Sequence, residues 1–275
     1  MSTNNRRVFL KMSAKLATSF VLFNPFKNLI RQVEPIFPCW ESLIDYARWC
    51  PNVHNLQPHK IKIISETEAD LYYDSERLLP IGDPDCVFVT VAMGIFIEHL
   101  SIAASAYDVK VELIKVYDPI SIQSIGYTCF AKLKMLSAFQ SEELSPSLIL
   151  ERRTSRGHYN CHSLDANLLT KIRNEAQKYG HDFFHSNDKK VIDFIVKLNQ
   201  QTLFDDLSSP SNRKELDHLF RYNEQEASMK KDGLWARCMG FPGLLMKSVF
   251  RNPEAWETGV KKVMLANYYK DSFKG

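Results

Sequence analysis

The sequence contains no Cys-x-x-Cys pair, and its six cysteines are scattered without the spacing of a metal site. Nor does it have a glycine-rich tract of low complexity or a run of lysine and arginine with interleaved aromatic residues. The first absence argues against a zinc module, and the last argues against a nucleic-acid partner. His181 and His185 stand four residues apart, but no third ligand is evident, so we expect no metal site. The cysteines leave the redox compartment open.

The composition is that of an ordinary globular protein. The chain has 275 residues, of which 45% are hydrophobic and 24% are charged, enough for one large domain or two small ones. Its formal net charge is +3. Six basic residues precede the first acidic residue, Glu34, so the rest of the chain is close to neutral. This balance gives no reason to expect a polyanionic partner.

The N-terminus has the layout of an export signal. Asn5-Arg6-Arg7-Val8-Phe9-Leu10-Lys11 is followed by an apolar stretch, residues 12–26, that is broken by Lys15. This resembles a twin-arginine signal, Ser/Thr-Arg-Arg-x-Phe-Leu-Lys, from which Asn5 departs. We therefore expect residues 1–33 to be a signal or a membrane tether, which implies a periplasmic or membrane-associated protein. The alternative is an amphipathic helix on a cytoplasmic protein.

Periodicity in the rest of the chain predicts a mixture of helices and strands. Apolar residues at helical spacing, or in alternation, set the expected elements. The expected helices are 40–49, 87–107, 165–179, 187–204 and 214–229, and the expected strands are 60–64, 70–73, 109–116, 127–136 and the segment that begins at 263–269. Gly94 falls inside the second helix, where glycine costs about 1 kcal/mol relative to alanine. We expect a close neighbour there.

Glu151 to Tyr159 carries a cluster of groups that suit a phosphate. Arginine guanidinium groups bind phosphate oxygens bidentately, and threonine and serine hydroxyls add donors. The candidate phosphate-binding residues are Arg152, Arg153, Thr154, Ser155 and Arg156. A solvated charged surface is the alternative interpretation of the same cluster.

A second candidate is the polar loop between Pro51 and Pro58. A loop that is rigid at both ends can present amide groups to a planar polar ligand. The residues that we expect to contact such a ligand are Pro51, Asn52, Val53, His54, Asn55 and Gln57. A plain connection between a helix and a strand is the alternative.

Together the two stretches resemble the nitroreductase family of FMN-dependent oxidoreductases. In that family a helix ends in Ala-Pro-Ser-x-x-Asn-x-Gln-Pro-Trp, and here Asn52 stands for the serine and His59 for the tryptophan. The family's Arg-Arg-Ser-x-Arg-x-Phe motif resembles the run from Arg152 to His158, with Thr154 and His158 as departures. Because the arginine motif lies in the middle of the chain, the sequence is similar to the Acg-type branch, in which two such halves are fused.

The resemblance implies an α+β protein with a three-layer nitroreductase-like fold, in which helices flank a central, mostly antiparallel sheet. The halves would be residues 34–147 and 148–275, and the second lacks the family's last strands and long helix. One complete FMN site would lie between the halves of a pseudo-dimeric monomer. We call the two segments the first half and the second half from here on.

The resemblance also implies a chemistry. The flavoprotein would reduce nitroaromatic, quinone or similar small-molecule acceptors by two-electron steps at flavin N5. The donor would be NAD(P)H or, for an exported protein, a quinol or a protein. No catalytic side chain can be named from the sequence. The alternative is a catalytically silent protein that binds and sequesters flavin.

Overall fold

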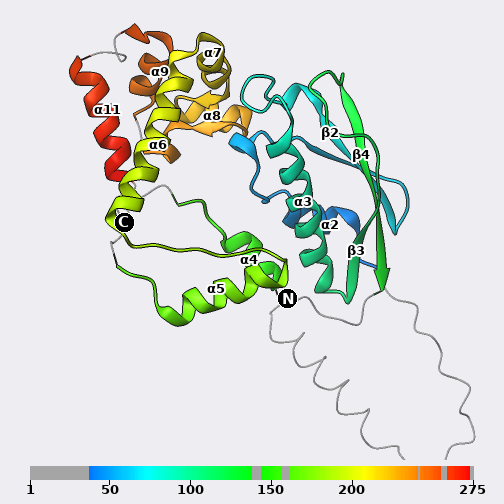
Figure 1. Cartoon of the computed structure of the whole chain (residues 1–275). Coiled ribbons are helices and arrows are strands. Elements are labelled where there is room, and N and C mark those ends of the chain that lie inside the picture. The colour runs from blue at the N-terminus through cyan, green and yellow to red at the C-terminus, as the bar shows by residue number, and fades with distance from the viewer. Residues whose placement is uncertain (1–36, 138–143, 156–161, 241, 255–258, 273–275) are drawn as a thin grey trace, which may run out of the picture. The chain divides into compact units, whose positions relative to one another are not determined.

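A four-stranded antiparallel sheet is the framework of the first half (Figure 1). The computed structural model describes residues 37–137, 144–155, 162–240, 242–254 and 259–272. The strands, in the order β1-β2-β4-β3, are β1 (His59–Ile63), β2 (Glu68–Asp74), β4 (Tyr127–Ser137) and β3 (Val109–Val116). Along β2, Ala69, Leu71 and Tyr73 are buried, and Glu68, Asp70 and Tyr72, which alternate with them, are polar and partly exposed. The predicted α+β class with an antiparallel sheet is confirmed.

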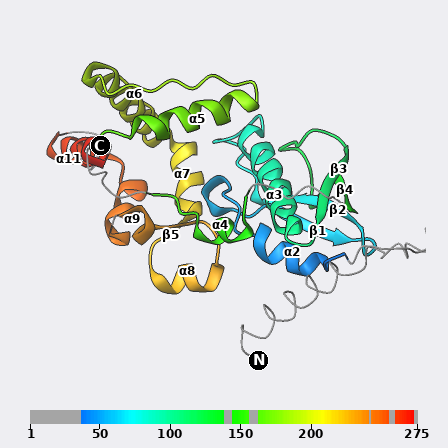
Figure 2. The ribbon, with the colours of Figure 1, turned by 90° about the horizontal axis from the view of Figure 1, so that it is seen from below.

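Two helices pack on the buried face of this sheet, as Figures 1 and 2 show. Helix α2 (Trp40–Ala47) buries Trp40 and Leu43. It ends before Pro51, because a proline disfavours the helical conformation in the residue that precedes it. Helix α3 (Val87–Ser105) begins after Asp83, whose carboxylate accepts the first free N–H groups, Phe88 N at 3.2 Å and Val89 N at 3.1 Å. Both helices lie where the sequence predicts them. The third layer of the expected fold remains a prediction.

Helix α3 differs from expectation at Gly94. A Cβ built on this glycine would meet nothing within 4 Å, so the close neighbour predicted there is absent from the described part of the chain. By length and composition alone this helix could cross a membrane, but 56% of its most apolar 18-residue stretch is buried inside the protein. Core helices of water-soluble proteins pass the same test, so burial against the sheet accounts for its composition.

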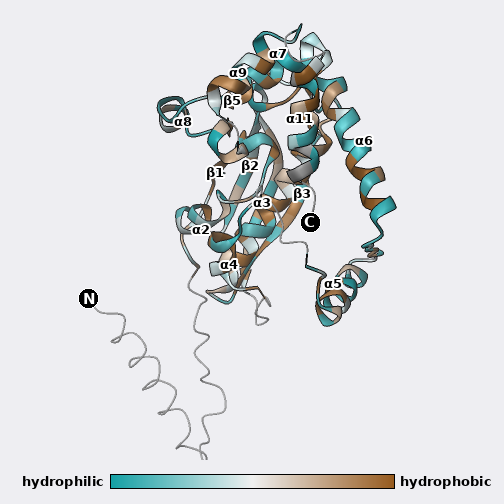
Figure 3. Ribbon diagram, turned by 90° about the vertical axis from the view of Figure 1, so that its left-hand side faces the viewer, coloured by the Kyte–Doolittle hydropathy of each residue, from teal (hydrophilic) through white to brown (hydrophobic). Residues whose placement is uncertain are grey.

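The described part of the second half is mainly helical. Its helices are α4 (Pro146–Glu151), α5 (Ala166–Lys178), α6 (Lys189–Ser208), α7 (Pro210–Leu219), α8 (Glu224–Lys230), η3 (Ala236–Met239), α9 (Gly243–Arg251) and α11 (Gly259–Ser272). Two short parallel strands, β5 (Phe220–Arg221) and β6 (Leu234–Trp235), pair between them. Within α6, Val196 alone is buried, and apolar side chains remain exposed along its length (Figure 3).

Two predictions for the second half were wrong. The segment 263–269 lies inside α11 and is not a strand. The single helix predicted over 214–229 is interrupted by β5 and continues as α8. The predicted signal, residues 1–33, lies outside the described residues.

Candidate functional site

One cavity brings together the two stretches that the sequence singles out. It has a volume of about 450 Å³ and is lined by residues of the Pro51 loop, of the arginine cluster and of the segment after α8. Its lining residues are Arg48, Trp49, Cys50, Pro51, Asn52, His54, Asn55, Arg152, Thr154, Ala227, Lys231, Asp232, Gly233, Leu234, Trp235, Cys238 and Met239. We call it the candidate flavin cavity. Two fragments about a hundred residues apart in sequence therefore share one site.

The loop that forms one wall has an unusual backbone. His54, Asn55 and Gln57 have φ angles of 47°, 57° and 53°, in the left-handed region that side chains other than asparagine and glycine seldom adopt. The Asn52 carboxamide stabilises the turn, because its oxygen accepts Gln57 N at 2.9 Å and its nitrogen donates to Cys50 O at 3.1 Å. Asn52 thus shapes the loop in addition to lining the cavity.

The loop is fastened to the second half by hydrogen bonds to residues 231–233. Gly233 N donates to Asn55 O at 3.0 Å, and Asn55 Nδ2 donates to Gly233 O at 3.4 Å. Gln57 Nε2 donates to Lys231 O at 2.8 Å. Gly233 has φ +74°, and a Cβ there would lie 2.3 Å from Leu219 O, so this position requires glycine. Gln57 therefore holds the wall and does not line the cavity.

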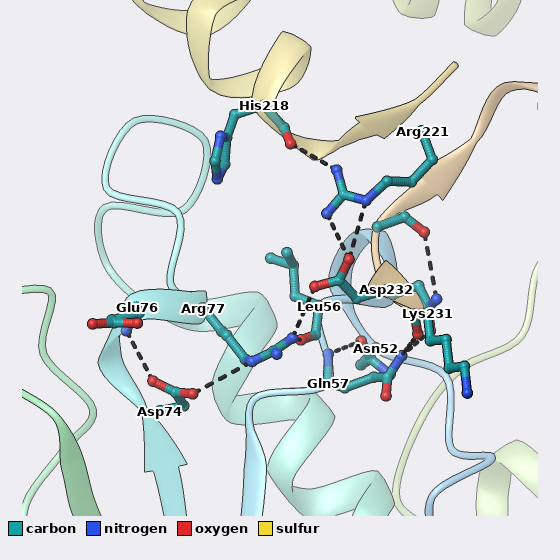
Figure 4. A network of polar contacts seen from close by, with 12 residues as sticks. Asn52, Leu56, Gln57, Asp74, Glu76, Arg77, His218, Arg221, Lys231 and Asp232 are labelled. Carbon is teal, nitrogen blue, oxygen red and sulfur yellow. Dashed lines mark hydrogen bonds and ion pairs between the residues drawn. The ribbon is translucent and has the colours of Figure 1, made fainter. Parts of the chain in front are cut away.

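A network of ion pairs stabilises the same contact (Figure 4). The Asp232 carboxylate accepts from Arg221 Nη2 at 2.6 Å and Nε at 3.1 Å, and from Arg77 Nη1 at 3.2 Å. Arg77 Nη1 also donates to Leu56 O at 2.6 Å, and its Nε lies 3.4 Å from Asp74. Arg221 is 4% exposed. We call Arg77, Asp232 and Arg221 the interhalf network. None of these three residues was among the predicted site residues.

The arginine cluster contributes only part of its predicted set to the cavity. Arg152 and Thr154 line it, and Arg152 Nη1 donates to Thr154 Oγ1 at 3.2 Å. Arg153 is exposed and donates instead to the carbonyl groups of Leu150 and Arg152. Ser155 is exposed and is not part of the lining. Arg156 lies outside the described residues.

Val53 also departs from its predicted role. It packs on the small apolar cluster of Leu56, Leu79 and Leu219, which joins the two halves, and it is not part of the lining of the candidate flavin cavity. Trp235, from β6, lines the cavity as well. Arg48, Trp49 and Lys231 were not predicted. Arg48 and Trp49 are the last two residues of the helix predicted over 40–49, and they follow the observed helix α2, so their position beside the Pro51 loop was the available signal.

Burial controls the titrating groups behind the loop. Burial raises the pKa of the Cys50 thiol to about 12, although the positive charge of Arg152 opposes the shift. Burial likewise lowers the pKa of His59 to about 4. The His59 ring stacks on Phe96 with a centroid distance of 4.5 Å, and its Nε2 lies 3.2 Å from Ala92 O and 3.7 Å from Cys50 Sγ. At neutral pH both groups are uncharged, so the cavity's charge comes from Arg48, Arg152, Lys231 and Asp232.

Comparison with known proteins leaves the family open. No protein-family model and no curated protein matches the sequence. Among the described residues, no group of three or more histidine, cysteine, aspartate or glutamate side chains could hold a metal ion.

Proposed function

We propose that this protein binds FMN in the candidate flavin cavity and acts as an FMN-dependent oxidoreductase of the nitroreductase type. The observation that supports this most directly is the shared lining. Arg152 and Thr154, from the stretch that resembles the family's arginine motif, line the same cavity as Pro51, Asn52 and Asn55. The resemblance assigns both stretches to one flavin site, and they are joined here across the two halves.

The charges of the lining suit the phosphate of FMN. Arg48, Arg152 and Lys231 are cationic, and the single lining carboxylate, Asp232, is already neutralised by Arg221 and Arg77. Arginine and lysine side chains provide charge-assisted donors for phosphate oxygens, and the Thr154 hydroxyl adds another donor. The cavity therefore has an excess of positive charge where an anionic group would enter.

The remaining lining suits a planar ring. Trp49, Pro51, Trp235 and Met239 offer apolar contact, and Trp235 also lies 5.5 Å from the guanidinium of Arg237. The volume of about 450 Å³ lies within the range of small-molecule sites. When bound, FMN supplies the two-electron redox chemistry through its isoalloxazine ring. The protein's own residues would anchor the phosphate and position the ring.

Flavin sequestration is the second candidate function, and the cavity volume favours it. A cavity of about 450 Å³ is of the size of a single ligand. If FMN fills it, an acceptor needs access to the flavin ring from outside the cavity. A protein without that access would bind flavin and remain catalytically silent.

Flavin titration of an arginine variant tests the binding proposal. Arg152→Ala removes charge-assisted hydrogen bonds worth about 1.5 to 3 kcal/mol, so FMN affinity should fall at least about tenfold. Quenching of FMN fluorescence measures the affinity. Lys190→Ala, an exposed residue of α6 outside the cavity, is the control and should bind FMN as the wild type does. Equal affinities in both variants would show that the arginine cluster is a solvated surface.

Anaerobic stopped-flow reduction separates the two candidate functions. An oxidoreductase loaded with FMN should bleach with a donor and recover its colour with a nitroaromatic or quinone acceptor, whereas a sequestering protein should do neither. If the chain is exported, NADPH should reduce the flavin slowly and a quinol should reduce it faster. Fast bleaching at micromolar NADPH would instead indicate an ordinary cytoplasmic nitroreductase.

A further inference from the structure

One face of the four-stranded sheet is left open by α2 and α3, which pack on the other face (Figure 1). Along each strand, the residues that alternate with the core residues lie on the open face, and they are half-buried or exposed. We call it the outer face. The proposed flavin site does not use it. Six lysines belong to it: Lys60, Lys62, Lys110, Lys115, Lys132 and Lys134.

Three of these lysines are paired with carboxylates of the same face. The Glu68 carboxylate lies 2.8 Å from the Lys132 ammonium group and 3.4 Å from that of Lys134. The Glu112 carboxylate lies 3.2 Å from the Lys110 ammonium group. These pairs leave one positive charge in their part of the face.

The other three lysines form no ion pair among the described residues: Lys60, Lys62 and Lys115. Two of them lie against tyrosine rings instead. The Lys60 ammonium group is 5.9 Å from the centre of the Tyr127 ring, and that of Lys115 is 4.5 Å from the centre of the Tyr117 ring. Both rings are exposed. The outer face therefore presents cations and aromatic rings together.

The outer face as a whole is weakly positive. The six lysines stand against three carboxylates of the strands and two of the adjoining loops, an excess of one charge. The five acids are Glu66, Glu68, Asp70, Glu112 and Asp118. Glu66, Glu68 and Glu112 lie at the end of the sheet where β1 turns into β2. The positive excess therefore lies toward the other end, where residues 117–126 join β3 to β4. We call these residues the β3–β4 loop.

The β3–β4 loop ends in an apolar tip. Ile125 is 93% exposed, more than any other large apolar side chain in the described part of the chain. Ile122 and Tyr127 beside it are also exposed. Single apolar residues on a surface are ordinary, but a group of them that projects from a loop indicates an interaction site.

The body of the protein holds this tip outward. The Tyr73 hydroxyl shares a hydrogen bond of 2.6 Å with the Ser124 hydroxyl, and it accepts Ser121 N at 3.4 Å. Ser75 N donates to Gly126 O at 3.1 Å. Both sides of the tip are therefore fastened to β2 and to the segment that follows it, and Ile125 stays in water.

We propose that the β3–β4 loop and the lysines beside it bind the surface of a phospholipid bilayer. Ile122 and Ile125 enter the boundary between headgroups and acyl chains, where apolar side chains leave water. Tyr127 lies among the headgroups, a position that suits an apolar ring with a polar hydroxyl. Lys60 and Lys115 donate to lipid phosphates, so anionic lipids strengthen the binding. This inference goes beyond the proposed flavin function and does not depend on it.

The exposed isoleucines decide between a bilayer and another anionic partner. A single-stranded nucleic acid would use the lysines and the tyrosines, because bases stack on aromatic rings. It would leave Ile125 in water. A bilayer uses all three kinds of side chain, and they meet at one end of the sheet.

Hydrogen–deuterium exchange of the full chain locates the contact. Vesicles of equal parts phosphatidylcholine and phosphatidylglycerol should slow amide exchange in residues 121–127 and leave exchange in α5 unchanged. The slowing should be weaker with phosphatidylcholine alone, because that lipid has no net charge. This local measurement does not depend on the apolar stretch 12–26, which can attach the chain to vesicles by itself.

Variants test the two kinds of contact separately. Ile125→Glu should raise at least about tenfold the lipid concentration that gives half of the protection of residues 121–127. Lys60→Glu with Lys115→Glu should raise it similarly on the mixed vesicles. Phe184→Glu is the matched control, since Phe184 is 88% exposed between α5 and α6, and it should behave as the wild type does. Circular dichroism melting checks that each variant is folded, and Ile125→Ser replaces Ile125→Glu if the latter is not.

Several outcomes overturn the proposal. One is unchanged exchange in residues 121–127, whether or not the chain sediments with the vesicles. Another is an equal effect of Ile125→Glu and Phe184→Glu. Protection by single-stranded DNA and not by vesicles would assign the outer face to a nucleic acid. Protection that rises with protein concentration in the absence of lipid would assign it to a second copy of the chain.

Discussion

Removing the Asp232 carboxylate should destabilise the protein strongly, because it leaves a buried guanidinium without its counter-ion. Arg221 is 4% exposed and directs two N–H groups at one Asp232 oxygen, at 2.6 and 3.1 Å. Breaking a buried pair by deleting one partner costs about 3 to 5 kcal/mol. The Asp232 side chain is 19% exposed, so we place the effect of Asp232→Ala near the lower limit, at about 3 kcal/mol. Total stabilities of about 5 to 15 kcal/mol are usual, so the loss should be large.

Urea unfolding followed by circular dichroism measures this loss, with two variants as comparison. Glu175→Ala breaks an exposed pair with Lys178 at 2.9 Å and should cost less than about 1 kcal/mol. The double variant Asp232→Leu with Arg221→Met replaces the pair by apolar side chains. It should be more stable than Asp232→Ala, since no charge is then left buried.

Equal shifts of the urea midpoint in Asp232→Ala and Glu175→Ala would contradict the prediction of a buried, uncompensated charge. That result would mean that water reaches Arg221 and compensates its charge. A double variant as unstable as Asp232→Ala would also contradict it, because the loss would then come from the shape of the site and not from the buried charge.

Further predictions concern the loop, the glycines and the N-terminus. Burial depresses the pKa of His59 from 6.5 in the unfolded chain to about 4 in the folded protein. The unfolded state therefore takes up the proton first, and the folded state should lose on the order of 3 kcal/mol of stability as pH falls from about 6.5 to 4. His59→Gln should flatten that part of the pH profile of urea unfolding. Gly233→Ala should lower the melting temperature sharply, because the new Cβ would clash with the Leu219 carbonyl oxygen. Gly94→Ala should raise the melting temperature, because alanine in an open helical position adds up to about 1 kcal/mol to the free energy of unfolding. Arg6→Lys with Arg7→Lys should leave the protein in the cytoplasm by cell fractionation, and unchanged fractionation would refute the export signal.

Local patterns predicted the elements of the first half closely. The alternation of Val109 and Val111 with polar residues fixes strand β3, and the long apolar run of α3 is bounded by Asp83 and the left-handed Asp108. Strand β3 and the ends of helix α3 are set by residues close to one another in the chain, so their positions can be predicted from local sequence patterns. The candidate cavity was predictable in part for a different reason, since the chemistry of their side chains identified the arginine cluster and the Pro51 loop separately, and the resemblance placed both at one site.

The second half was less predictable because distant partners set its breaks. The helix predicted over 214–229 is interrupted where Arg221 pairs with Asp232 and its backbone joins β6. A local signal was nevertheless present. Asn223 caps α8 by accepting Glu226 N at 2.8 Å, and Glu226 in turn accepts Asn223 Nδ2 at 3.0 Å, a pairing three residues apart that marks a helix start. The short apolar run around Val263 resembled a strand, but it forms part of the helix α11, which extends from Gly259 to Ser272. A short apolar run does not by itself distinguish a strand from a helix.

The bonds between the Pro51 loop and residues 231–233 determine when the candidate cavity can form during synthesis. Asn55 and Gly233 are 178 residues apart in the chain, and Gln57 and Lys231 are 174 apart. At typical elongation rates of about 5 to 20 residues per second, the first partner waits roughly 10 to 35 seconds for the second. A ribosome-bound chain that ends before Gly233 therefore lacks one wall of the cavity. Any ligand that the cavity binds could enter only after both halves are translated, so it could not guide the folding of the sheet that is made first.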